Sequence, residues 1–296
     1  MRILILGIDA LEYDLVHEWN LRHLKQKEYG KVTVPITKGL GEPATEIVWP
    51  CFITGKEPKQ MGFESPILYR QPYKWFSDHI YNQFTSSFTD IHPENILEEK
   101  KSRKRRILDN ISSIMTKAGV FYHPTRKNIK ASTLFDNSSL HTVHFHIPVY
   151  DTDPFPPYRK QIVDVIMKTL PPSEFLSSCK HSFQERWAEL ETYLQHHSNW
   201  DVVMMYWFCL DAIQHAFFNK KLKIMDFYLL FNKYVGQLLH KLPSDILVLI
   251  ISDHGQKNGI HTNFGFYSSN IKMHLKNPNI TDFKDIIEKK IQKTRI

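Results

Sequence analysis

Six aspartate and histidine side chains combine oxygen and imidazole donors in a pattern that can bind metal ions. They are Asp9, Asp211, His215, Asp253, His254 and His261. Carboxylate oxygens and imidazole nitrogens suit Zn²⁺ or Mn²⁺ better than Ca²⁺ or a thiolate-bound metal. We therefore expect a metal centre assembled from distant parts of the chain. The alternative is that these residues are ordinary polar groups at strand ends.

The spacing of these residues is compatible with shared coordination. Asp211 and His215 are four residues apart, which places both side chains on one face if the segment is helical. In Ser252–Gly255, the adjacent Asp and His can diverge toward two ions, while the glycine permits a tight turn. His261 follows after a short loop, close enough to join the same cluster.

Continuous apolar runs precede the three aspartates and predict the elements that position them. Arg2–Ile8, Asp201–Phe208 and Asp245–Ile251 lack polar alternation, which is typical of parallel strands buried on both faces. In open parallel sheets the ligand site lies beyond the carboxyl ends of the strands. We therefore expect an α/β fold, with a mostly parallel central sheet flanked by helices on both faces and the aspartates at one edge.

Weaker patterns predict further elements. We expect strands at Lys31–Ile36 and His141–Val149. We expect helices at Tyr158–Leu170 and Ser173–His197, with Ser173 as N-cap of the second. Between Thr45 and Gly55, Pro50 makes the boundary of a helix ambiguous. His141, His144 and His146 share the second of these strands, where core or rim positions are favoured over a third metal site. Tyr150 and Arg159 follow it and are candidates for lining a substrate cleft.

Residues 71–140 lack clean periodicity, and we assign them to an inserted cap within a single catalytic domain, 1–296. The basic run Lys100–Arg106 lies in this region. It could contact a polyanion through phosphates, although a solvated helix face is the favoured interpretation.

Several motifs resemble the type I phosphodiesterase/nucleotide pyrophosphatase branch of the alkaline phosphatase superfamily, and most closely its archaeal-type phosphodiesterase-like members. They are Gly7-Ile8-Asp9-Ala10, Thr45 through Trp49 to Phe52-Ile53-Thr54-Gly55 with Pro58 and Gly62, Asp211-Ala212-Ile213-Gln214-His215, Ser252-Asp253-His254-Gly255 and Gly259-Ile260-His261. They occur in the family's order and leave only the middle of the chain unmatched.

The resemblance implies two divalent metal ions, Zn²⁺ or, as a second choice, Mn²⁺. It implies that Asp9, Thr45, Asp253 and His254 surround one ion and that Asp211, His215 and His261 hold the other. It also implies that Thr45 is the nucleophile. Metal coordination makes a threonine alkoxide accessible near neutral pH, and a second metal-bound water can hydrolyse the resulting phosphothreonine.

Other hydroxyls lie near Thr45, namely Thr33, Thr37, Thr54 and Ser65. In the family, the nucleophile stands nine residues before the Thr of a Thr-Gly pair, which selects Thr45. Without the resemblance, an ordinary helix N-cap would be the preferred interpretation of this residue. Many members of the family have an Asn three residues after the nucleophile, which hydrogen-bonds a phosphoryl oxygen, whereas the Val48 side chain at this position cannot.

The composition excludes a mainly disordered chain, because 42% of the residues are hydrophobic and no tract is of low complexity. The net charge of +7 is compatible with an anionic partner or with simple solubility. Three widely spaced cysteines indicate reduced, packed thiols. The apolar runs are too short for a signal peptide or a membrane helix, so we expect a cytoplasmic protein without membrane contact.

Together these features predict metal-dependent hydrolysis of a phosphodiester or pyrophosphate bond in a small phosphorylated substrate, possibly a nucleotide. One alternative is a phosphomonoesterase that uses the same site. Another is a catalytically silent member of the fold that binds polyanions. Sequence-specific nucleic-acid recognition is not expected, because no binding module is recognisable. The oligomeric state stays open.

Overall fold

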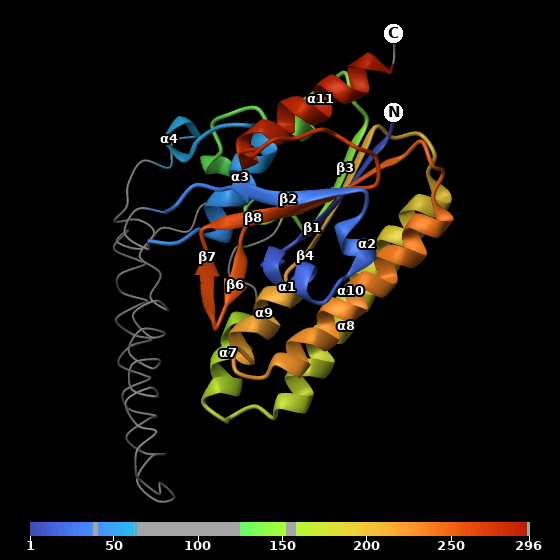
Figure 1. Cartoon of the computed structure of the whole chain (residues 1–296). Coiled ribbons are helices and arrows are strands. Elements are labelled where there is room, and N and C mark those ends of the chain that lie inside the picture. The colour runs from blue at the N-terminus through green and yellow to red at the C-terminus, as the bar shows by residue number, and fades with distance from the viewer. Residues whose placement is uncertain (38–40, 62, 64–124, 152–157, 295–296) are drawn as a thin grey trace, which may run out of the picture. The chain divides into compact units, whose positions relative to one another are not determined.

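The computed structural model describes residues 1–37, 41–61, 63, 125–151 and 158–294 (Figure 1). One compact unit contains Met1–Ile36, Glu42–Phe63 and Pro124–Ile296. A second unit, Thr37–Gly41 and Glu64–His123, lies almost wholly outside the described residues. Most of the predicted cap and the whole basic run Lys100–Arg106 therefore fall outside the described residues, and the cap stays a prediction.

The elements follow one another in an alternating α/β order. They are β1 (Ile3–Ile8), α1 (Tyr13–Glu18), α2 (Arg22–Lys25), β2 (Glu28–Thr33), α3 (Thr45–Thr54), α4 (Pro58–Met61), η1 (Arg126–Asn128), η2 (Leu134–Asp136), β3 (Thr142–Phe145), α7 (Tyr158–Ile166), α8 (Pro172–His196), β4 (Val202–Trp207), α9 (Cys209–Ala216), α10 (Lys221–Lys241), β5 (Leu247–Ser252), β6 (Gly255–Lys257), β7 (Ile260–Thr262), β8 (Phe264–Ser269), η3 (Ile280–Asp282) and α11 (Phe283–Lys293).

In the described part of the chain, six strands form the central sheet in the order β2-β8-β5-β1-β4-β3. β1 pairs in parallel with β4 and β5, and β3 pairs in parallel with β4. β8 runs antiparallel to both of its neighbours, β5 and β2. The three apolar runs identified in the sequence thus become adjacent central strands, and the prediction of a mostly parallel sheet is confirmed.

Helices cover both faces of the sheet (Figure 1). The neighbouring side chains of β4 point to opposite faces. Tyr206 packs edge-on against Trp49 of α3, whereas Trp207 contacts Trp187 of α8 and Phe231 of α10. α3 therefore lies on one face, with α11 packed beside it, and α8 and α10 lie on the other. The strands β1, β4 and β5 between these layers are completely buried, as their unbroken apolar runs predicted.

Boundaries differ from the sequence predictions where local chemistry was ambiguous. The strand expected at Lys31–Ile36 begins and ends earlier, at Glu28–Thr33, where it pairs with β8. The predicted N-cap Ser173 is wrong, because α8 begins at Pro172 and its N-cap is Pro171. The N–H of the first helical residue has no partner within the helix, so a proline, which lacks this N–H, is well tolerated there. Pro172 therefore begins the helix one residue earlier than expected.

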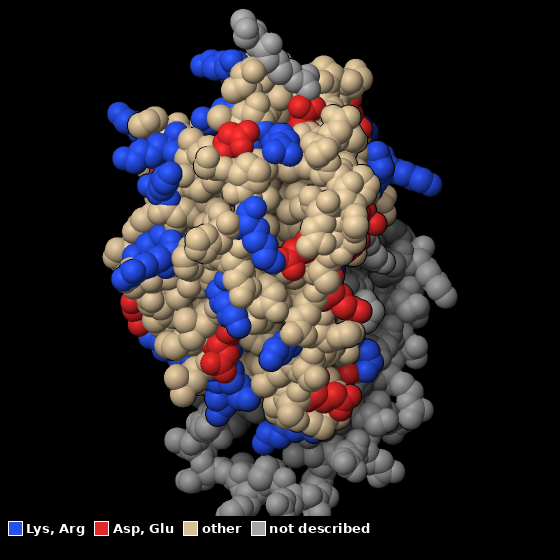
Figure 2. All heavy atoms as spheres, turned by 90° about the vertical axis from the view of Figure 1, so that its right-hand side faces the viewer, with Lys and Arg blue, Asp and Glu red and all other residues tan. Residues whose placement is uncertain are grey.

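Surface and core chemistry agree with a packed globular unit. Cys51, Cys179 and Cys209 are buried and unpaired, in agreement with reduced, packed thiols. On the face shown in Figure 2, lysine and arginine side chains are interspersed with aspartate and glutamate. Among the described residues, no helix has the length and apolar character needed to cross a bilayer.

Candidate metal centre and active site

The sheet topology brings the seven predicted site residues together at its carboxyl edge. Asp9 directly follows β1, Asp253 and His254 follow β5, Asp211 and His215 lie in α9 after β4, His261 lies in β7, and Thr45 is the first residue of α3. Because β1 lies between β4 and β5 in parallel, the residues after these strands meet at one edge. The short β6–β7 hairpin returns His261 to the same place.

The first group of side chains surrounds His254. Its Nε2 lies 3.3 Å from Asp9 Oδ1, 3.4 Å from Asp253 Oδ2 and 3.4 Å from Thr45 Oγ1. Asp9, Asp253 and His254 are each at most 1% exposed. Two carboxylates and an imidazole thus converge in a space that solvent scarcely reaches, and the hydroxyl of the partly exposed Thr45 lies beside them.

The second group lies beside the first. Asp211 Oδ1 is 3.2 Å from His215 Nε2 and 3.8 Å from His261 Nε2, and these two nitrogens are 3.0 Å apart. The rings of His254 and His261 stack with centroids 3.9 Å apart, so the two groups are contiguous. The i, i+4 spacing in α9 places the side chains of Asp211 and His215 side by side, as the sequence predicted.

Two sets of ligand atoms overlap at Asp211, and the atoms of each set lie close enough together to bind one ion. The ligand atoms of Asp211, His215 and His261 lie within 4.8 Å of one another, and so do those of Asp9, Asp211 and His254. Asp211 belongs to both sets. The family resemblance implies that Asp211 holds one ion only, whereas its ligand atom lies within reach of both sets.

The carboxylates carry an electrostatic cost that cations would relieve. Asp9 Oδ1, Asp211 Oδ1 and Asp253 Oδ2 are buried and have no hydrogen-bond partner among the described residues. Burial, together with the charges of Asp253 and Asp211, raises the pKa of Asp9 well above its usual range. Burial also raises the pKa of Asp253 to about 7. Burial alone would raise the pKa of Asp211 as well, but the charge of His215 lowers it.

Two of the three imidazoles, those of His254 and His261, are held in the neutral state that metal ligands require. Burial and the neighbouring charge of His261 hold the pKa of His254 well below its usual value, and burial with the charge of His215 lowers the pKa of His261. Neutral imidazoles bind metals, whereas imidazolium ions do not. His254 Nδ1 lies 3.1 Å from Gly255 O, and His261 Nδ1 lies 3.1 Å from Pro43 O. Donation from Nδ1 to these carbonyls leaves the Nε2 lone pairs facing the cluster.

Thr45 owes its position to close packing between α3 and the sheet. A Cβ on Gly7 would lie 2.9 Å from the ring of Trp49 and 3.3 Å from Met204, so only glycine lets the helix lie this close to β1. Trp49, four residues after Thr45, is fully buried. Thr54, the nearest competing hydroxyl in the helix, instead donates to Pro50 O at 2.6 Å and has a local structural role.

Sequence reasoning missed the residues that orient these ligands. Tyr206 donates to Asp9 Oδ2 at 2.5 Å, and burial together with the Asp9 charge raises the pKa of its hydroxyl, so that it stays protonated. Glu12, which is fully buried, accepts from Asp14 N and from Thr262 Oγ1 and so ties the loop after Asp9 to the β6–β7 hairpin. A polar Tyr at the end of an otherwise apolar strand was the one available signal.

Tyr150, one of the weaker candidates, contacts Arg126 and Asp136, which are not among the predicted site residues. Tyr150 is 7% exposed, and its hydroxyl accepts from Arg126 Nη2 at 2.8 Å. The Arg159 side chain is outside the described residues. His144 pairs with Asp151 at 2.8 Å and His146 with Glu189 at 2.7 Å.

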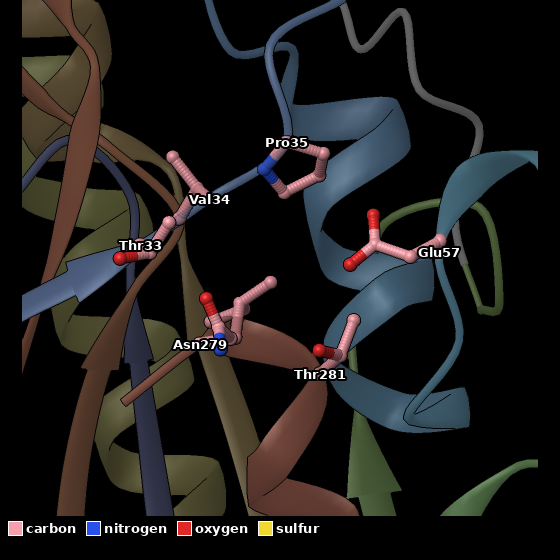
Figure 3. Close-up of a pocket in the computed structure, with 7 residues that line it drawn as sticks. Thr33, Val34, Pro35, Glu57, Asn279 and Thr281 are labelled. Atoms are coloured by element: carbon pink, nitrogen blue, oxygen red, sulfur yellow. The ribbon is translucent and has the colours of Figure 1, made fainter. Parts of the chain in front are cut away.

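A small pocket of about 140 Å³ lies at the other end of α3 (Figure 3). It is lined by Thr33, Val34, Pro35, Glu57, Asn279, Ile280 and Thr281. None of the predicted site residues lines this pocket. Its carboxylate, Glu57, follows the C-terminus of α3, whereas Thr45 begins the helix.

Solved structures that resemble this chain include three proteins with low sequence identity to it. Murine ectonucleotide pyrophosphatase/phosphodiesterase 5 is 12% identical, with a TM-score of 0.42 over 86% of this chain and 57% of that protein. The human protein gives 13% identity, a TM-score of 0.43, and 87% and 57% coverage. The PH0037 protein from Pyrococcus horikoshii is 10% identical, with a TM-score of 0.45 over 98% and 97% of the two chains. This chain thus spans 57% of the first two proteins.

By sequence, no curated protein matches this chain. The family assignment rests on the model of the family described as type I phosphodiesterase/nucleotide pyrophosphatase, which matches residues 3–281. That match extends from β1 to η3 and includes every predicted metal ligand. The chain belongs to the type I phosphodiesterase/nucleotide pyrophosphatase family, a family of metal-dependent phosphohydrolases.

Proposed function

We propose that this protein hydrolyses a phosphodiester or pyrophosphate bond in a small, nucleotide-type substrate, with Thr45 as nucleophile. The observation that carries this proposal is the position of Thr45 Oγ1, 3.4 Å from His254 Nε2. It lies beside two buried carboxylates, Asp9 and Asp253, each with one oxygen that has no hydrogen-bond partner among the described residues. Family membership supports the reaction class.

The donor set fits two divalent ions, for which Zn²⁺ is the first choice and Mn²⁺ the second. Asp9, Thr45, Asp253 and His254 would hold one ion, and Asp211, His215 and His261 the other. Asp211 also lies close enough to join the first set. When bound, such ions lower the pKa of a coordinated hydroxyl or water and neutralise charge on the phosphoryl group.

Thr45 begins α3, and this position favours a phosphoryl group. Ala44, the N-cap residue, has no side-chain oxygen to cap the first turn. The first-turn N–H groups and the helix dipole therefore favour an anion at this helix end. The phosphoryl oxygens of a substrate placed here would meet positive potential, while the phosphorus would face the Thr45 hydroxyl.

The reaction would proceed in two displacements. In the first, the Thr45 hydroxyl loses its proton to water, a bond forms between Oγ1 and phosphorus, and the bond from phosphorus to the leaving oxygen breaks. In the second, a water oxygen bonds to phosphorus, the bond to Oγ1 breaks, and Thr45 regains a proton. A phosphothreonine links the two steps.

The discriminating assay compares bis-p-nitrophenyl phosphate with p-nitrophenyl phosphate after reconstitution with Zn²⁺ or Mn²⁺. We expect faster turnover of the diester. Faster turnover of the monoester would replace the proposal by a phosphomonoesterase that uses the same residues. Failure to hydrolyse either ester, or any nucleotide diester or pyrophosphate, would favour the catalytically silent member of the fold.

Thr45→Ala tests the nucleophile. We expect turnover to fall at least about 1000-fold, because the displacement loses its attacking oxygen. Thr45→Ser keeps a hydroxyl and should retain part of the turnover. Elemental analysis should show that metal content is retained. Thr54→Val is the matched control, because this hydroxyl bonds to Pro50 O within the same helix. Unchanged turnover in Thr45→Ala would remove Thr45 from its proposed role.

A further inference from the structure

Gln256 contacts a predicted metal ligand from a buried position. It lies in β6, is 2% exposed and pairs across the hairpin with His261. Its amide nitrogen is placed 2.8 Å from His215 Nδ1, and its amide oxygen has no hydrogen-bond partner among the described residues. One side chain thus reaches from the β6–β7 hairpin, which carries one ligand, to α9, which carries another.

The direction of this hydrogen bond depends on the tautomer of His215. His261 donates from Nδ1 to Pro43 O, so its Nε2 can accept from His215 Nε2, 3.0 Å away. In that arrangement, His215 carries its proton on Nε2 and accepts at Nδ1 from the Gln256 amide nitrogen. The buried amide oxygen then remains unsatisfied, which costs free energy.

Metal binding requires the opposite tautomer. An imidazole that binds an ion through Nε2 must carry its proton on Nδ1 and needs an acceptor there. Rotation of the Gln256 amide by half a turn exchanges its nitrogen and oxygen, which occupy nearly the same positions. The oxygen would then accept from His215 Nδ1, as Gly255 O and Pro43 O accept from the other two imidazoles.

From this geometry we propose that Gln256 is a positioning residue that accepts a hydrogen bond from His215 Nδ1 and thereby holds His215 Nε2 ready for a metal ion. The proposal rests on the metal centre of the proposed function. In addition to the predicted ligands, it assigns a role to Gln256, which would contact no ion but would set the tautomer of the ligand His215. Gln256 also couples α9 to the hairpin, because it contacts His215 from the strand opposite His261.

The test is the affinity for Zn²⁺ alone, measured by competition with a chromophoric chelator at neutral pH. In Gln256→Met, which has no acceptor, we expect binding of one of the two ions to weaken about 10- to 100-fold. In Gln256→Glu, whose carboxylate can only accept, we expect binding to be retained. If the Met variant does not fold, Gln256→Asn keeps the amide but cannot reach Nδ1, and the same loss is expected.

The matched control is Gln26→Met. Gln26 also has a buried amide oxygen without a partner among the described residues, and its nitrogen bonds to Ser268 Oγ at 2.9 Å, away from the metal ligands. This change should leave Zn²⁺ affinity unaltered. Equal affinity in wild type and Gln256→Met, or equal losses in the Met and Glu variants, would overturn the role of Gln256. If wild-type protein bound no Zn²⁺, the proposed metal centre would fail together with this role.

Discussion

Several side chains in this protein are buried in surroundings that suit metal ligands. The same surroundings are unfavourable for a charged carboxylate when no cation is bound. Asp9 and Asp253 are fully buried and lie near the same imidazole nitrogen, and their pKa values are raised in consequence. A buried carboxylate without a partner opposes folding when it is charged. The residues that would bind metal therefore destabilise the metal-free protein at high pH.

Asp253→Asn should show this cost in chelator-treated protein. The pKa of Asp253 is about 7 in the folded protein, against a usual value of 3.8. Protonation is thus favoured by folding, and this stabilising contribution is present below the usual pKa and lost as pH rises toward 7. Above that pH we expect the metal-free variant to have a free energy of unfolding higher by on the order of a few kcal/mol.

Urea unfolding at several pH values measures the effect of Asp253→Asn. The difference between variant and wild type should grow with pH in chelator, and should reverse when Zn²⁺ is present, because the variant has lost a ligand. A difference that does not change with pH would show that the Asp253 carboxyl is not held in its protonated form by the fold.

Tyr206→Phe tests the hydrogen bond to Asp9. Loss of the phenol leaves Asp9 Oδ2 without its donor at 2.5 Å, so the carboxylate is less firmly oriented. We expect metal affinity to weaken by about 10-fold or more, with a smaller effect on folding. Tyr267→Phe removes a similar bond, from Tyr267 to Glu28 at 3.3 Å, and should not change metal affinity. Equal affinities in wild type and Tyr206→Phe would contradict the orienting role.

At the scale of elements, the candidate site depends on how closely α3 and the β6–β7 hairpin approach the parallel strands. α3 lies against Gly7, and the hairpin lies against the loop after β1, where a Cβ on Gly255 would lie 2.1 Å from Glu12 Oε2. Both contacts leave no room for a side chain. Small residues at these points therefore determine the distances between the predicted nucleophile and ligands.

Gly7→Ala should displace α3 and with it Thr45. The added Cβ would lie 2.9 Å from Trp49, and relief of this overlap by overpacking costs about 1 to 3 kcal/mol of stability. We expect turnover to fall because the hydroxyl moves relative to His254. Gly30→Ala is the control: its Cβ would lie 2.8 Å from Tyr267, a comparable overlap in β2. Equal kcat values in the two variants, after correction for folded fraction, would show that α3 position does not matter.

At the scale of the whole molecule, the predicted ligands lie after β1 and β5, in α9 and β7, and at the start of α3, so they extend from Asp9 to His261. A cation held by all of them would link segments more than 240 residues apart in sequence, as the contact between Asp9 and His254 already does. When a cation binds only the folded state, the free energy of that binding adds to the free energy of unfolding.

Metal removal should therefore lower stability throughout the described unit. At a free Zn²⁺ concentration of 100 times Kd, we expect a gain of about 2.7 kcal/mol for each ion that binds only the folded state. Thermal unfolding with Zn²⁺ and with excess chelator measures this shift. Asp211→Ala should abolish most of it, because Asp211 lies in both sets of potential ligands. An unchanged Tm on chelation would count against metal binding by the folded protein.

Periodicity and residue type were enough to predict the three buried central strands and the aspartates that follow them. Strand β8 was not predicted, and Thr45 was selected by the family resemblance. Long apolar runs permit little besides a buried strand, and the strands β1, β4 and β5 appear within one or two residues of the predicted runs. Boundaries at Pro171 and in β2 were less certain, because prolines and half-exposed strands depend on their neighbours.

The sequence by itself determined which donors are available, that three aspartates follow buried strands, and that Asp211 and His215 share a helix face, since these depend on local spacing alone. Only the tertiary structure decided that Asp211 lies between both sets of ligand atoms, that Tyr206 orients Asp9 and that Gln256 contacts His215. These contacts join residues far apart in the chain. Their distances depend on strand order and on close packing at Gly7 and Gly255, which no local pattern contains.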